Sequence, residues 1–187
     1  AMAVWVNRGI EIKGLYMDDL YFWSCYGEQS FLQYVFPVGS TRFRFLYYLA
    51  AWLEMAVVRN HVGWFVPFNI LLNAAVAWSI YFIGRRLYRA KGIGFLCASM
   101  FLISRMAYYQ IGQVLGLMET MALWMAILVL WYLFRYLNEK DSPVCFYISC
   151  LLYFGVCFVH ERYMALFPLL LLVLLFKKSR KLWEWGA

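Results

Sequence analysis

Charged residues are scarce in this 187-residue chain: they make up 14% of it, whereas 65% of its residues are hydrophobic. A soluble domain has roughly 25% charged and roughly 45–50% apolar residues, so a water-soluble fold could not bury this much apolar surface. A transmembrane β-barrel is excluded too, because barrel strands alternate polar and apolar side chains, whereas 66–83 and 114–134 are near-continuous apolar runs. The sequence therefore predicts an all-α, polytopic bundle of transmembrane helices.

Patterns for metal binding, secretion and repetition are missing as well. The five cysteines show no metal-binding spacing and no evident disulfide plan, and four of them lie in or beside apolar runs. No secretory signal of the usual form is visible, nor any internal repeat. The stretch 1–6 is apolar but too short to cross a bilayer. We interpret it as the outer end of a preceding helix and expect the chain to be part of a longer protein.

The chain does contain a series of apolar runs of membrane-spanning length. We predict about five spans, at 64–84, 92–108, 114–134, 144–160 and 163–176. Basic residues follow alternate spans, as the positive-inside rule requires. They are Arg85, Arg86, Arg89 and Lys91 after the first span, Arg135 and Lys140 after the third, and Lys177, Lys178, Arg180 and Lys181 after the fifth.

These three basic segments account for the net charge of +7. They hold ten lysines and arginines against three acids, and the other charged residues cancel. A nucleic-acid partner would require a clustered basic face, which is absent. The lipid bilayer is the expected partner, and the basic segments are expected on its cytoplasmic side.

Three regions follow from this topology. Residues 1–63 form an extracytoplasmic loop, 64–176 form the transmembrane bundle, and 177–187 form a basic cytoplasmic tail. Within the loop, 43–58 is apolar but interrupted by charges, and counting it as a span would invert the sign of every later loop. We predict that it is a helix lying in the outer membrane interface.

An acidic pair, Asp18 and Asp19, lies within an aromatic and apolar run of the outer loop. Carboxylates in a low-dielectric region are costly unless they have a partner or a function. In one interpretation Asp18 caps a short helix and Asp19 is solvated. In the other, one carboxylate is a general base or a ligand of a hard divalent cation, and its neighbour sets its pKa.

A second polar cluster, His160, Glu161 and Arg162, separates the fourth and fifth predicted spans. It does not match the HExxH zinc pattern, because Met164 occupies the position of the second histidine. It is either a helix-to-helix turn in which Glu161 and Arg162 pair, or a substrate site. In the second case Arg162 would hold a phosphate and His160 would orient a hydroxyl.

A third group surrounds the turn between the second and third spans. Gln110 and Gln113 are three residues apart, so on a helix they would share a face and could present amides to a sugar. Glu119 lies inside the next predicted span, and an acid within the membrane favours a functional role. An ion pair with Arg105 would also explain its position. The substrate-binding candidates of the chain are Arg105, Tyr109, Gln110, Gln113, Glu119, His160, Glu161 and Arg162.

All three groups map to the same side of the predicted membrane. The topology was derived from span lengths and basic residues alone, so this convergence is an independent result. An outward cleft that holds carboxylates, guanidinium groups and aromatic rings at the lipid boundary suits a ligand that is part lipid, part phosphate and part sugar.

The order of these features resembles the N-terminal half of the membrane glycosyltransferases with the GT-C fold, which use polyprenyl-phosphate-linked sugars. In that family an acidic pair follows the first transmembrane helix, as Asp18 and Asp19 would if a helix preceded the chain. A long outer loop with interfacial helices follows, and then a membrane helix with a basic cytoplasmic turn, as at 85–89. The stretch 104–119 is similar to the outer loop between the third and fourth membrane helices of the family.

The resemblance implies transfer of a sugar, with inversion, from a polyprenyl-phosphate donor to an acceptor glycan, lipid or protein outside the cytoplasm. Asp18 or Asp19 would deprotonate the acceptor hydroxyl or help hold a divalent cation, Mg or Mn. Arg162 or Arg105 would neutralise the departing lipid phosphate. The first helix of the family and its later helices are missing from this chain.

Two other functions stay open on the sequence alone. One is a non-catalytic membrane subunit or a flippase-like, lipid-binding protein. The other is a transporter, which ranks lower because most charges lie at span ends and the spans contain few glycine or proline breaks. The expected location is a bacterial inner membrane, with the active site on its extracytoplasmic side.

Overall fold

The computed structural model describes residues 1–11, 18–39, 42–113, 116–138 and 143–185, except for the side chains of Asp18 and 178–185. Every regular element in this part of the chain is a helix, which confirms the predicted all-α class. The helices are α1 (Met2–Val6), α2 (Asp18–Cys25), α3 (Phe31–Val35), α4 (Phe45–Val58), η1 (Val62–Trp64), α5 (Phe65–Tyr88), α6 (Lys91–Leu102), α7 (Arg105–Ile111), α8 (Leu117–Asn138), α9 (Pro143–Val159), η2 (Glu161–Leu166) and α10 (Phe167–Trp185).

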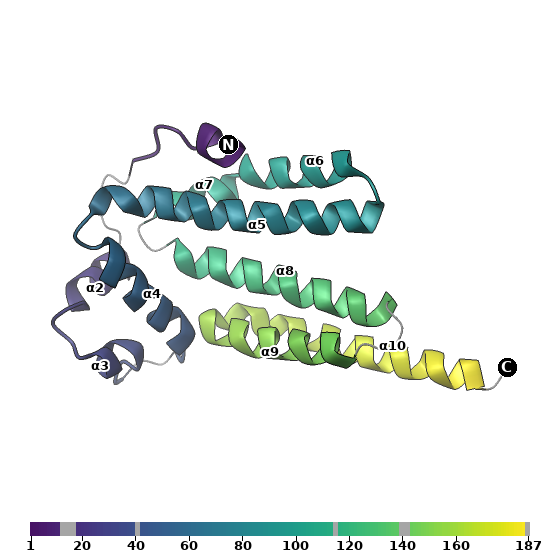
Figure 1. Cartoon of the computed structure of the whole chain (residues 1–187). Helices are drawn as coiled ribbons and strands as arrows, with labels where there is room; N and C mark the ends of the chain where they lie inside the picture. Colours follow the sequence, from purple (N-terminus) through teal and green to yellow (C-terminus); the bar gives the residue numbers. More distant parts are fainter. Residues whose placement is uncertain (12–17, 40–41, 114–115, 139–142, 186–187) are drawn as a thin grey trace.

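The long helices lie side by side, and the short helices α2, α3 and α4 gather at one end of them (Figure 1). Helix α8 lies between the α5–α6 pair and the α9–α10 pair, and it contacts both α5 and α9. Helix α4 runs obliquely to the long helices and packs against α8 and α9. The bundle thus carries a helical cap at one end.

Two helices are long and apolar enough to cross a membrane: 62–88, which joins η1 to α5, and α8. Helices α6 and α7 make a third candidate if they form one span, although they meet at an angle of 54°. Helix α9 is apolar but has only 17 residues. The described part of the chain therefore contains two or three spans by length and composition, and the predicted total of about five is not confirmed.

The bend between α6 and α7 departs from the continuous second span that the sequence predicted. Its cause is Ser104, whose backbone is extended and whose hydroxyl accepts a hydrogen bond from the amide of Ala107 at 3.2 Å. This is the geometry of a helix N-cap. The serine therefore ends one helix and begins the next inside an apolar run.

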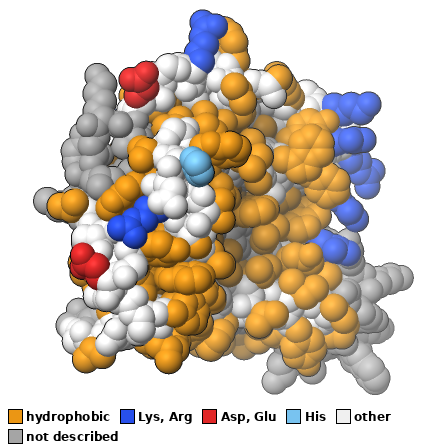
Figure 2. Space-filling view, turned by 60° about the vertical axis from the view of Figure 1, so that its left-hand side comes forward, with side chains coloured by type: hydrophobic (Ala, Val, Ile, Leu, Met, Phe, Trp, Pro, Cys, Tyr) orange, Lys and Arg blue, Asp and Glu red, His pale blue; other side chains and the backbone are white. Residues whose placement is uncertain are grey.

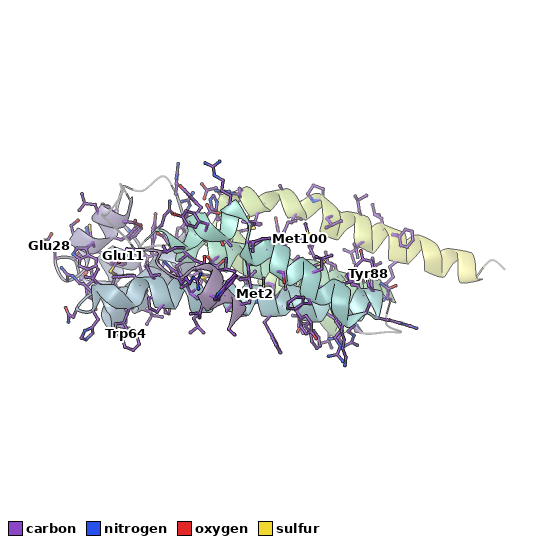
Figure 3. The ribbon with its side chains drawn as sticks, turned by 90° about the horizontal axis from the view of Figure 1, so that it is seen from above. Met2, Glu11, Glu28, Trp64, Tyr88 and Met100 are labelled. Atoms are coloured by element: carbon purple, nitrogen blue, oxygen red, sulfur yellow. The ribbon has the colours of Figure 1, made fainter. Side chains whose placement is uncertain are left out.

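The two ends of the bundle differ in charge. In Figure 3, Trp64 and the acids Glu11 and Glu28 lie at one end, and Tyr88 lies toward the other. We call these the mixed-charge end and the basic end. The charged side chains that the structure describes at the basic end are all basic: Arg85, Arg86, Arg89, Lys91, Arg135 and Lys177. The described residues of the predicted basic loops thus gather at one end. Hydrophobic side chains cover much of the face that Figure 2 shows.

An aromatic core joins the helical cap to the bundle. The Phe22 ring meets the rings of Tyr34 and Tyr47 edge to face, with centroids 5.8 and 5.2 Å apart. This core extends to buried residues of α8 and α9, such as Ala122 and Val156. Edge-to-face pairs favour particular ring orientations beyond simple burial. The core therefore fixes α2 and α4, which carry the charged residues described next.

Candidate functional site

An ion pair links the start of α4 to η2. Arg44 precedes α4 and is buried, and its Nε and Nη2 both donate to the carboxylate of Glu161. This bidentate geometry is the strongest that an arginine and a carboxylate can form. Arg44 lowers the pKa of Glu161 to about 2, so the pair stays ionised over the physiological range. It fastens the helical cap to the end of α9 across 117 positions of sequence.

A second ion pair joins η2 to the first turn of α8. The Nη2 of Arg162 lies 2.7 Å from Glu119 Oε1, and His160 Nε2 lies 3.5 Å from the same oxygen. Arg162 Nε also donates to His160 Nε2 at 3.0 Å. The sequence offered Arg105 as the partner of Glu119, or Arg162 as the partner of Glu161. The structure shows neither of these pairs and instead joins Arg162 to Glu119.

His160 lies between these two ion pairs as a neutral ring. Its burial lowers its pKa, and the positive charge of Arg162 lowers it further. Arg162 approaches both ring nitrogens, because its Nε donates to Nε2 and its backbone N–H lies 3.4 Å from Nδ1. A neutral histidine in this position orients the arginine side chain and adds no charge to the cluster.

Asp19 and Glu54 of α4 form a separate centre that contains only acids. Both residues are buried, and neither carboxylate oxygen of Glu54 has a hydrogen-bond partner among the described residues. Burial raises the pKa of Glu54 to about 8, and the nearby charge of Asp19 contributes to the rise. Glu54 is therefore protonated at neutral pH. Asp18 begins α2, and its side chain lies outside the described part of the chain.

The acids and the arginines thus form two centres instead of one cluster. Arg44 and Glu54 lie ten positions apart along α4, which corresponds to about 15 Å of helix. A pocket beside the arginines is lined by Tyr21 and Phe22 of α2 and by Arg42 and Arg44, and its described lining includes neither Asp19 nor Glu54.

The other sequence candidates lie farther along the bundle. Arg105 and Tyr109 are exposed on α7, next to the bend. Gln110 is 1% exposed, and neither atom of its amide has a partner among the described residues. Gln113 lies beyond the end of α7, so it does not share a helical face with Gln110, and its carbonyl accepts a hydrogen bond from Asn69 at 2.6 Å. Their proposed contact with a sugar stays a prediction.

A divalent cation would have few ligands in the described part of the chain, which contains no group of three histidine, cysteine or acidic residues. Asp19 and Glu54 together provide two carboxylates. Glu54 keeps its proton at neutral pH, however, so it is not a ready ligand for a cation. The cation that the sequence suggested at Asp18 and Asp19 stays a prediction.

Sequence reasoning missed Arg44 and Glu54 as site residues. Both interrupt the apolar stretch 43–58, and they served there only as evidence against a membrane span. The criterion that identified Asp19 and Glu119, a charge in an apolar environment, would have found them too.

No protein-family model, curated protein or solved structure matches the chain. No role can therefore be transferred to these residues from a relative. A functional proposal therefore depends on the placement of the charged side chains at the end of the bundle that carries the helical cap.

Proposed function

We propose that this chain is the membrane part of a glycosyltransferase that moves a sugar from a polyprenyl-phosphate donor to an extracytoplasmic acceptor. One observation carries the proposal. Polar residues from four separate parts of the sequence, at positions 19, 44, 119 and 160–162, meet at the same end of an apolar bundle. Buried and ion-paired charges at a lipid boundary are costly to keep, which favours a function for them.

In this proposal Asp19 or Asp18 takes the proton of the acceptor hydroxyl. Asp19 lies in the first turn of α2, where the helix dipole stabilises a carboxylate. The neighbouring Glu54 keeps its own proton at neutral pH, so it adds no second charge beside the ionised base. A group of this kind contributes typically about 10²–10⁴-fold to a rate.

The arginines supply positive charge for the donor. Arg162 is the better of the two sequence candidates, because Arg105 lies at the bend of α6 and α7, whereas Arg162 is held by His160 and Glu119. Its side chain is 59% exposed, so it can meet a phosphate at the headgroup level. If Mg or Mn takes part, Asp18 and Asp19 would hold it, as the sequence suggests, and it would add positive charge beside the acceptor.

The test is sugar transfer from a polyprenyl-phosphate donor in membranes that contain Asp18→Asn or Asp19→Asn. We expect at least one variant to lose activity about 100-fold or more. Glu28→Gln is the matched control, because Glu28 is an exposed acid at the same end of the molecule. Full activity in both aspartate variants would refute the proposed base. Absence of transfer in the unaltered chain would favour the lipid-binding alternative.

A further inference from the structure

We propose that three buried amides, Asn69 and Asn73 of α5 and Gln110 of α7, bind a monovalent cation, Na⁺ or K⁺. We call these three side chains the amide cluster. It lies inside the bundle, where α7 contacts both α5 and α8 (Figure 1). A cation site at this place goes beyond the proposed function and does not depend on it.

The cluster forms where three helices meet. Asn69 and Asn73 are four residues apart, so they lie on the same face of α5. Asn69 Nδ2 donates to the carbonyl of Gln113 at 2.6 Å, which places this face against the chain just beyond α7. Gln110 lies three residues before Gln113, and its carbonyl leaves no room for a Cβ on Gly116, which precedes α8.

The amides of the two asparagines have a fixed orientation. Asn69 Nδ2 donates to the Gln113 carbonyl, and Asn73 Nδ2 donates to the Asn69 carbonyl at 3.2 Å. A carbonyl can only accept a hydrogen bond, so in both side chains the amide nitrogen is the bonded atom. The Oδ1 atoms of Asn69 and Asn73 therefore remain, and neither has a hydrogen-bond partner among the described residues.

The cluster is closed to water and its amides are only partly satisfied. Asn69, Asn73 and Gln110 are each 1% exposed or less. Neither amide atom of Gln110 has a partner in the part of the chain that the structure describes. The neighbouring residues outside that part are Val114 and Leu115, which have no polar side-chain atoms. Unpartnered amides are costly in an apolar bundle, which favours a ligand that the oxygens can bind.

The donor set and the enclosure favour a monovalent cation. Amide and carbonyl oxygens are ligands of hard cations. The cluster contains no carboxylate, and burial of an ion becomes more costly as its uncompensated charge rises, which disfavours a divalent ion. Side chains that are exposed by 1% or less suit an atom-sized ligand better than a sugar ring.

The interrupted helix supports the same assignment. Membrane helices that are broken within a bundle leave backbone carbonyls available to bind Na⁺. Helix α7 begins at the bend formed by Ser104 and ends at Ile111, beside the amide cluster. A buried water could also satisfy the oxygens, and the measurements below distinguish it from an ion. Since a bound ion would remove the cost of the Gln110 amide, an apolar replacement there should stabilise the chain only in sodium-free and potassium-free buffer.

Thermal denaturation of the chain in lipid nanodiscs tests the proposal. Sodium chloride, potassium chloride and choline chloride are compared at equal ionic strength. We expect at least one alkali chloride to raise the midpoint by about 3–6 °C over choline when the ion is tenfold above its Kd. Binding of radioactive sodium, and of radioactive rubidium as a substitute for potassium, measures the ion directly.

Substitutions locate the ion in the amide cluster. Asn73→Leu should abolish both the rise in midpoint and the bound radioactivity. Asn138→Leu is the matched control, because Asn138 Nδ2 also donates to the carbonyl four residues earlier, but on an exposed surface. Gln110→Glu adds a carboxylate without breaking a described hydrogen bond, so at pH 8 it should bind the ion about tenfold more tightly.

Equal midpoints in the three salts, with no bound radioactivity, would overturn the proposal and favour a buried water. A rise that persists in Asn73→Leu would also overturn it, since the ion would then bind elsewhere. If Asn73→Leu does not fold, Gln110→Glu tests the same site, and an unchanged affinity there would contradict the proposal. Sugar transfer is not measured, so failure of the glycosyltransferase proposal leaves these results unaffected.

Discussion

The two ends of this bundle use charge in different ways. At the mixed-charge end, several acids and bases are buried or joined in pairs, as in Arg44–Glu161 and Glu119–Arg162. At the basic end, the described charges are of one sign, and most lie on the surface or over aromatic rings, as Lys177 lies 3.7 Å from the Tyr136 ring centroid. Exposed charges cost little and suffice to orient a helix in a membrane. Buried charges are costly, which is why the first end is the candidate site.

The comparison shows that an arginine has a different role at each end of the bundle. Arg85 near the end of α5 is exposed and can be explained by topology alone. Arg44 before α4 is buried and holds two elements together. Stability measurements on matched variants from the two ends should therefore separate structural charges from topological ones.

The largest expected effect is the pH dependence that Glu54 creates. Its pKa rises from the ordinary 4.5 to about 8 on folding. Between these two pH values the unfolded chain loses the proton and the folded chain keeps it, so stability falls as pH rises, by about 5 kcal/mol in total. Glu54→Gln removes this loss. Thermal denaturation in detergent with EDTA should show that the stability of the variant relative to the wild type rises from pH 5 to pH 8. Above pH 8 this difference should stay constant.

If the stability of the wild type and that of Glu54→Gln changed in parallel with pH, the raised pKa of the buried Glu54 would be contradicted. Glu28→Gln is the control at the same end, since that acid is exposed and should leave the profile unchanged.

Arg44→Gln should have the next largest effect, a loss of about 2 kcal/mol. This value is below that for a fully buried pair, because the Glu161 side chain is 44% exposed. The pKa of Glu161 is depressed to about 2. The contribution of the pair is therefore complete above pH 4.5 and disappears as pH falls toward 2. Denaturation of the variant and the wild type at pH 7 and pH 3 should show a difference that shrinks on acidification.

Gln110→Leu should stabilise the chain by about 1 kcal/mol. The buried amide of Gln110 has no described partner, and an apolar side chain of similar size removes that desolvation cost. The sequence analysis assigned this residue to sugar binding, so transfer and thermal stability should be measured on the same preparation. A more stable variant with full activity would limit Gln110 to packing, whereas lost activity at higher stability would support its role in binding.

The smallest effect is expected at the basic end. Arg85→Gln should change stability by less than about 0.5 kcal/mol, because Arg85 is exposed. A loss comparable to that of Arg44→Gln would remove the contrast between the two ends.

The sequence predicted the helices well and their partners poorly. The apolar runs around 64–84 and 114–134 became α5 and α8, because length and hydropathy determine where a membrane helix forms. The bend at Ser104 was missed, since one capping serine in an apolar run is easily overlooked.

The partner choices could not be predicted from the chain alone. Span lengths and basic residues predict the side of the membrane on which Glu161 lies, but they do not predict that Arg44, 117 positions away, is the residue that meets it. That contact depends on how α4 packs against α8 and α9. The same limit explains why Asp19 was grouped with the arginines and lies instead beside Glu54.

The central claim is that the two ends lie on opposite sides of the membrane, with the mixed-charge end outside. Glu28→Cys and Arg89→Cys place exposed thiols at the two ends, and the native cysteines, which are buried or half-buried, set the background. A membrane-impermeant maleimide is added to intact cells. The account predicts that Glu28→Cys is labelled at once and Arg89→Cys only after permeabilisation. Labelling of both from the same side would contradict it.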